Sequence, residues 1–140
     1  MTGAARDRLL GELIGLARAT EGNEHLITAD VADVAAEVLC AEAADPDALL
    51  RRIDETKRAM IPDCFACASP CGRNNAHDLS RWGEEPAEIH GLKQNLLALL
   101  RRKAAEGCRE RALFRGLIAL GIEGYAVSDL ELLMLELDRL

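Results

Sequence analysis

Aliphatic side chains recur at three- and four-residue steps along most of this 140-residue chain, and this spacing constrains its fold more than any other feature. Because apolar residues make up 49% of the chain and aromatic residues only 3%, the core must be built from aliphatic side chains. We therefore predict an all-α, single-domain helix bundle of about five to six helices over residues 1–140. The predicted inward stripes are Leu9, Leu10, Leu13, Ile14 and Ala17; Val31, Val34, Ala35, Val38 and Leu39; Leu49, Leu50, Ile53 and Met60; Ile89, Leu92, Leu96, Leu99 and Leu100; Leu113, Leu117 and Leu120; and Leu130, Leu133, Met134 and Leu137.

Capping residues predict where several of these helices begin. Thr28 can cap the second helix, and Asp45 followed by Pro46 is typical of an N-cap and a first helical residue. Ser128 and Glu131 have the spacing of a capping box, which predicts the start of the final helix.

Proline and glycine predict where the helical pattern is interrupted. Pro62 ends the third helix, because proline disfavours helical geometry in the preceding residue, and Pro86 opens the fourth. Gly107 either bends one long helix or separates two. Residues 61–83 lack the apolar periodicity and contain three cysteines and the only tryptophan of the chain. We predict a cysteine-rich loop there, between the two helical halves.

The charge of the chain argues against nucleic acid as a partner. With 24 acidic and 17 basic residues the formal charge is -7, and such a surface repels phosphate backbones. Short basic groups at 51–52 and 101–103 lie within helical patterns that also contain glutamates, so we predict that they form solvated helix faces.

Hydropathy and cysteine usage indicate where the protein resides. No apolar run approaches the roughly 18 to 20 residues that a membrane helix needs, and Asp7 and Glu12 interrupt any signal-peptide core. The five cysteines are an odd number, with three of them within eight residues, which suits a reducing compartment. We expect a soluble, cytoplasmic protein with no membrane association.

Cys64, Cys67 and Cys71 form the candidate metal site. The C-x2-C spacing lets one turn of backbone direct two thiolates at a common metal, and the third cysteine follows four residues later. Pro62 and Pro70 stiffen the approach to the cluster. Such compact clusters bind either an iron–sulfur cubane of the [4Fe–4S] type or zinc.

The fourth ligand is open, since both metals usually take four protein ligands and the motif supplies three. The candidates are Cys108, returning from the helical half, and His77, six residues beyond Cys71. A cubane could instead leave one iron open to a small molecule, and we favour an open or non-cysteine position. An unbroken helix from Pro86 would carry Cys108 roughly 33 Å away.

Other residues near the motif have structural interpretations. The three cysteines could be buried small side chains or an oxidisable C-x-x-C pair, and we expect Cys40, beside an apolar stripe, to be a buried structural thiol. Arg73, Arg81 and Trp82 could shield a cluster, but we expect Trp82 to pack on the bundle and the arginines to pair with acids.

The chain also carries a family resemblance. It extends from Asp63-Cys64-Phe65-Ala66-Cys67 through Pro70-Cys71-Gly72-Arg73 to Pro86-Ala87-Glu88-Ile89 and Gly91-Leu92-Lys93. Over roughly residues 60–120 the chain resembles small helical relatives of the hybrid-cluster (prismane, hydroxylamine reductase) proteins. The resemblance implies a helix bundle and an iron–sulfur cubane, although the family motif has four cysteines in a longer spacing. It does not imply hydroxylamine reductase activity, which belongs to a much larger domain.

Three functional hypotheses follow. The first is an iron–sulfur or electron-transfer module whose acidic surface meets a redox partner protein. The second is a non-enzymatic scaffold or partner-binding module with a structural zinc or no metal. The third is a thiol switch in which Cys64 and Cys67 form a reversible disulfide.

Overall fold

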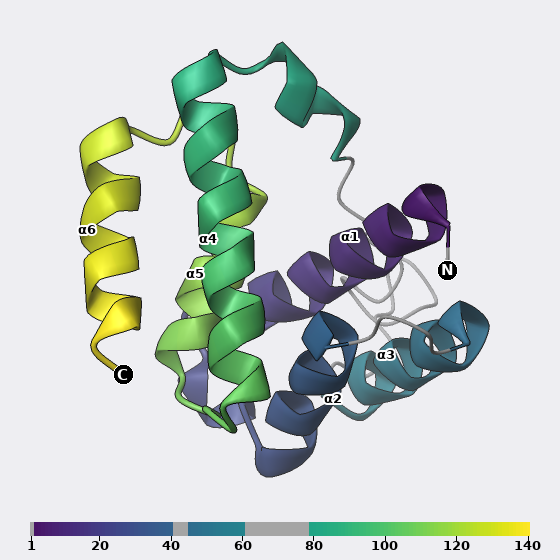
Figure 1. Cartoon of the computed structure of the whole chain (residues 1–140). Coiled ribbons are helices and arrows are strands. Elements are labelled where there is room, and N and C mark those ends of the chain that lie inside the picture. The colour runs from purple at the N-terminus through teal and green to yellow at the C-terminus, as the bar shows by residue number, and fades with distance from the viewer. Residues whose placement is uncertain (1, 41–44, 61–78) are drawn as a thin grey trace.

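The computed structural model describes residues 2–40, 45–60 and 79–140, and within them the protein is all-helical, as predicted (Figure 1). The described residues contain no β-strand. The elements in chain order are α1 (Gly3–Ala19), the 3-10 helix η1 (Glu24–Leu26), α2 (Ala29–Cys40), α3 (Pro46–Met60), the 3-10 helix η2 (Ser80–Glu84), α4 (Ala87–Ala105), α5 (Ala112–Leu120) and α6 (Val127–Asp138).

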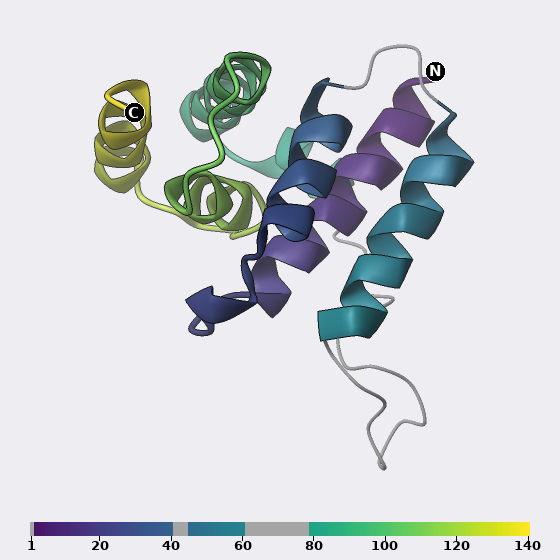
Figure 2. The same cartoon turned by 90° about the horizontal axis from the view of Figure 1, so that it is seen from below.

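The helices form two neighbouring groups. Helices α1, α2 and α3 lie side by side, and α4 and α6 pair on the other side of the molecule, where α5 packs against both (Figures 1 and 2). Contacts of α1 with α5 and of α2 with α4 join the groups. Helix α1 therefore packs against α3 within its own group and against α5 in the other group.

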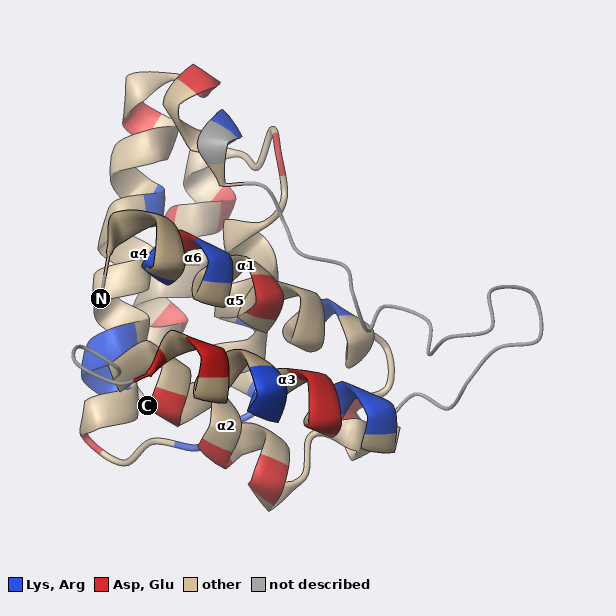
Figure 3. Ribbon diagram, turned by 90° about the vertical axis from the view of Figure 1, so that its right-hand side faces the viewer, with Lys and Arg blue, Asp and Glu red and all other residues tan. Residues whose placement is uncertain are grey.

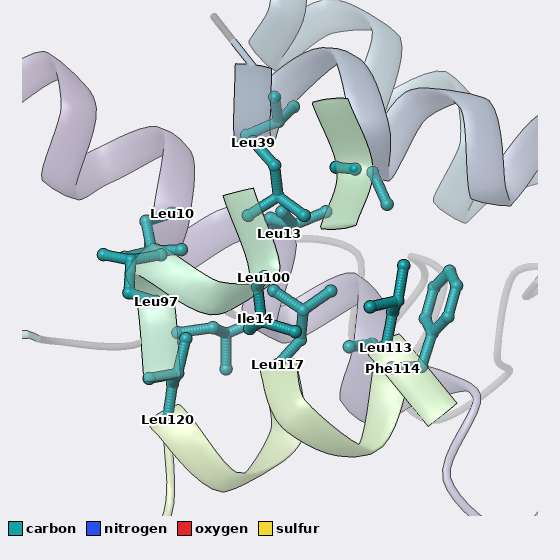
Figure 4. Close-up of a cluster of buried hydrophobic side chains, with 14 of the residues drawn as sticks. Leu10, Leu13, Ile14, Leu39, Leu97, Leu100, Leu113, Phe114, Leu117 and Leu120 are labelled. Atoms are coloured by element: carbon teal, nitrogen blue, oxygen red, sulfur yellow. The ribbon is translucent and has the colours of Figure 1, made fainter. Parts of the chain in front are cut away.

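A single aliphatic core connects the two groups. Side chains from α1, α2, α4 and α5 converge in it, and Figure 4 shows Leu13, Leu100 and Leu117 among them. All three are completely buried, as the helical spacing predicted. Gly116 of α5 permits Leu100 of α4 to pack directly against the α5 backbone, because a Cβ built at Gly116 would lie 2.8 Å from a methyl carbon of Leu100.

The predicted caps are confirmed for two helices and wrong for one. The Thr28 hydroxyl accepts a hydrogen bond from the Val31 N–H, and a carboxylate oxygen of Asp45 accepts one from the Asp47 N–H. Helix α6, however, has Ala126 as its N-cap and begins one residue before Ser128, without a side-chain cap. Its first residue, Val127, is partly buried against the core, and this contact favours a helix that begins before Ser128.

The interruptions also differ in detail from the prediction. Gly107 separates two helices, and its φ of 89° places it in the left-handed region that glycine adopts at helix ends. At the end of the predicted loop 61–83, the residues Ser80–Glu84 form the short helix η2, which extends one residue beyond the loop. The cysteine-bearing residues 61–78 lie outside the described part of the chain.

Charged residues are mixed on α3 but purely acidic on α2 (Figure 3). Arg52 of α3 pairs with Glu37 of α2, and both side chains are about half exposed, as expected for a solvated face. The prediction is wrong for Lys103, which is only 6% exposed.

Among the described helices, none combines the length and apolar composition needed to cross a lipid bilayer.

Candidate functional site

The predicted cluster ligands Cys64, Cys67 and Cys71 and the candidate ligand His77 all lie outside the described residues. Elsewhere, in 2–40, 45–60 and 79–140, no three histidine, cysteine, aspartate or glutamate side chains are grouped so that they could hold a metal ion. The metal site therefore stays a prediction from the sequence, and the structure describes what flanks it.

Cys108 lies at the far end of α4 from η2. It is half-buried against the core, and its N–H donates a hydrogen bond to the Lys103 carbonyl just after the turn at Gly107. The 19 residues of α4 span about 28 Å at 1.5 Å per residue. This length separates Cys108 from Ser80–Glu84, the first element that the structure describes after the cysteine motif.

Cys40 does not have the buried position that we expected for a structural thiol. It is exposed at the last residue of α2, whereas its neighbours Val38 and Leu39 are buried. Each residue advances a helix by roughly 100°, so Cys40 lies outside the buried stripe of α2, whose last residue is Leu39. An exposed thiol of this kind is a useful control position for cysteine chemistry.

The N-terminal flank of the cysteine segment is attached to α1 through a buried ion pair. Lys57, one turn before the end of α3, is fully buried, and its Nζ donates a hydrogen bond to a carboxylate oxygen of Glu12 at 3.1 Å. Met60, the last residue of α3, packs against the core. The chain thus enters residues 61–78 from a helix that is bound to α1.

The C-terminal flank of the segment packs against the helical core, where η2 contacts α4. Leu79 packs against the core, and with Trp82 and the α1 residues Arg6 and Leu10 it lines a surface hollow of about 330 Å³. Met60 and Leu79, which flank the segment 61–78, therefore both pack against the helical core.

A second buried ion pair joins Glu85, directly after η2, to Lys93 of α4. The Nζ atom of Lys93, whose side chain is 1% exposed, lies 2.7 Å from a carboxylate oxygen of Glu85 and also donates to the Ile122 carbonyl at 2.8 Å. It lies 5.9 Å from the centre of the Trp82 ring, within cation–π range. The indole N–H of Trp82 donates to the Leu120 carbonyl at 3.0 Å.

These contacts satisfy carbonyl groups at the end of α5, where a helix has no partners of its own for its last C=O groups. The positive charge of Lys93 also lies at the negative end of the α5 dipole. Lys103 does the same for α6, donating to the carbonyls of Asp138 and Leu140. The predicted packing of Trp82 on the bundle is confirmed, as is the pairing of Arg81 with acids, here Glu84 and Glu123.

Sequence reasoning missed the buried lysines Lys57 and Lys93 and misplaced Lys103. A signal was present, because each occupies a position of an apolar stripe. Lys57 follows Ile53 by four residues, and Lys93 follows Ile89 by four. A lysine at such a position either reaches solvent with its long stem or finds a buried acid, and only the packing decides which.

Comparison with protein-family profiles, with curated proteins and with solved structures finds no match to this chain. The resemblance to hybrid-cluster relatives thus stays a prediction from the motifs in residues 60–120.

Proposed function

We propose that this chain is an iron–sulfur protein with an electron-transfer role, in which Cys64, Cys67 and Cys71 are ligands of a [4Fe–4S] cluster. The observation that carries the proposal is their C-x2-C-x3-C spacing, since soft thiolates gathered in one short segment select iron–sulfur clusters or zinc. Such a cluster accepts and donates single electrons when it is bound.

The flanks of the segment support this role. Lys57 with Glu12 on one side, and Lys93 with Glu85 on the other, fix the two ends to a helical core, and both lysines are almost completely buried. Ligands carried between two fixed ends lose less conformational freedom on binding than ligands on a free tail. A basic redox partner suits the acidic charge of -7.

Anaerobic purification followed by metal and sulfide analysis tests the proposal directly. We expect about four iron and four acid-labile sulfide per chain, with the visible absorption of a cubane. Iron-free, colourless protein prepared under these conditions would contradict the proposal. Zinc at about one per chain would then favour the structural-metal alternative.

Cys64→Ser should abolish or strongly reduce the iron content, because one of only three thiolates of the motif is lost. The matched control is Cys40→Ser, which removes an exposed thiol at the end of α2. Iron and sulfide are measured for both variants after identical anaerobic preparation. Equal losses in the two variants would show that the effect is not specific to the motif.

The fourth ligand determines whether the cluster is closed or can bind a small molecule at an exposed iron. Because α4 separates Cys108 from η2, we expect Cys108→Ser to keep the iron content and the spectrum of the parent. His77→Ala should change the spectrum or the pH dependence of iron loss only if its imidazole is a ligand. Loss of iron in Cys108→Ser would contradict an open or non-cysteine position.

A partner-binding scaffold is the second candidate function, with zinc or no metal at the cysteines. The observation that favours it is an open groove of about 680 Å³ between α4 and α6, with an apolar floor that includes Leu99 and Met134. If Cys64→Ser leaves the fold and partner binding intact, the cysteines are incidental to that role. The thiol-switch hypothesis has its own test, because a constant count of five free thiols after mild oxidation of metal-free protein would exclude it.

A further inference from the structure

Helix α6 lies at the edge of the molecule and packs only one of its faces. It contacts α4 and α5, and its buried residues are Leu130, Leu133 and Leu137 (Figures 1 and 2). These positions, at steps of three and four residues, form the stripe that the helical pattern predicts.

The opposite face of α6 is also apolar. Leu132 is 59% exposed and Leu135 is 55% exposed, and both exceed every other large hydrophobic residue of the described chain. At roughly 100° per residue, Leu135 projects almost directly away from the buried stripe. Large apolar side chains on both faces of a helix are normally covered on both faces, and the described part of the chain covers only one.

The exposed face continues into the groove between α4 and α6. Its apolar lining residues are Met134 and Leu135 of α6 and Leu92, Ala98 and Leu99 of α4, and its polar lining residues are Glu131, Asp138, Asn95 and Arg102. The apolar surface is therefore wider than a single helix face.

Two charged residues flank Leu135 symmetrically. Glu131 precedes it by four residues and Arg139 follows it by four, and both are exposed. They lie roughly 6 Å to either side along the helix and roughly 40° to either side around it. Neither forms an ion pair with another residue of the described chain.

We propose that two copies of this chain associate through α6, with the helices antiparallel and a two-fold axis passing beside Leu135. A rotation of 180° about that axis brings Arg139 of one copy opposite Glu131 of the other, and the reverse pair forms at the same time. The contact is self-complementary in charge at these two positions.

The expected interface is modest in size. Two 12-residue helices and the adjoining groove correspond to the lower end of specific interfaces, near 1,200 Å² in total. Weak and transient complexes lie at this end of the size range, and we expect a dimer that dissociates at about micromolar concentration.

Sedimentation velocity of the full chain, in the anaerobic or reduced state, tests this association over a range of protein concentrations. We expect a monomer–dimer equilibrium in the parent and at least about hundredfold weaker association in Leu135→Glu, which sets two carboxylates against each other at the axis. Because Leu135 is exposed in the monomer, circular dichroism should show an unchanged helix content. A parent that stays monomeric up to about millimolar concentration would overturn the proposal.

Charge reversal tests the antiparallel register independently. Glu131→Arg or Arg139→Glu alone creates two like-charge contacts by symmetry and should weaken the dimer about three- to tenfold. The double variant restores both pairs in reversed order and should return the dissociation constant to that of the parent. A dimer that responds to Leu135→Glu but shows no rescue in the double variant would overturn this arrangement. The matched control is Glu123→Arg, an exposed charge reversal away from α6, which should leave association unchanged.

Discussion

Glu85→Leu should lower the free energy of unfolding by about 3–5 kcal/mol, the range seen when one partner of a buried ion pair is removed. The substitution leaves the Lys93 ammonium, 1% exposed, with the Ile122 carbonyl and the Trp82 ring as its neighbours. Chemical denaturation of metal-free, reduced protein, followed by circular dichroism, measures the change. The metal-free state separates folding energy from cluster binding.

The double variant Glu85→Leu/Lys93→Met makes this prediction sharper. Replacing a whole buried pair by apolar side chains of similar size is often neutral or stabilising, so the double variant should be more stable than either single variant. One carboxylate oxygen of Glu85 is buried without a hydrogen bond from any described residue. Its desolvation cost is therefore not offset, and the native ion pair contributes less net stability. A loss of stability in the double variant equal to the sum of the losses in Glu85→Leu and Lys93→Met would contradict a coupled pair.

An exposed ion pair provides the matched control. Glu123 pairs with Arg81 at 3.0 Å, and both side chains are more than half exposed. Glu123→Gln should change stability by less than about 1 kcal/mol, because exposed pairs contribute little. A comparable loss in Glu123→Gln and Glu85→Leu would show that burial is not the cause.

The helices could be predicted from the sequence because their signals are local. The apolar stripes and the caps at Thr28 and Asp45 depend on residues within a turn of one another, and both describe the structure correctly. The predicted N-terminus of α6 is wrong because it is based on a local signal alone, the spacing of Ser128 and Glu131. The partial burial of Val127 depends on distant residues and overrides that spacing.

The surroundings of the candidate site depend on long-range contacts and could not be predicted in the same way. Lys57 meets Glu12 across 45 residues, and Trp82 meets Leu120 across 38. No periodicity in the sequence specifies which acid or carbonyl such a side chain reaches. The cysteine spacing is again a local signal, and it is what the metal prediction depends on.

Trp82→Ala should be the second large loss, about 3–5 kcal/mol of unfolding free energy. The indole is 9% exposed and belongs to the aliphatic core, so truncation leaves a cavity as well as losing buried surface. It also leaves the Leu120 carbonyl, near the end of α5, without its hydrogen bond from the indole N–H.

Trp82→Phe separates these two contributions, because phenylalanine keeps a ring but has no N–H to donate. We expect it to cost about 1–3 kcal/mol, the range for a buried carbonyl that loses its partner, and therefore less than Trp82→Ala. Since Trp82 fixes the C-terminal flank of residues 61–78, the same order should appear in the rate at which a chelator removes iron from the anaerobic protein. If the two variants lose stability equally, the hydrogen bond rather than the packing of the ring holds this flank. Unchanged iron loss in a destabilised Trp82→Ala protein would instead show that the flank does not support the metal site.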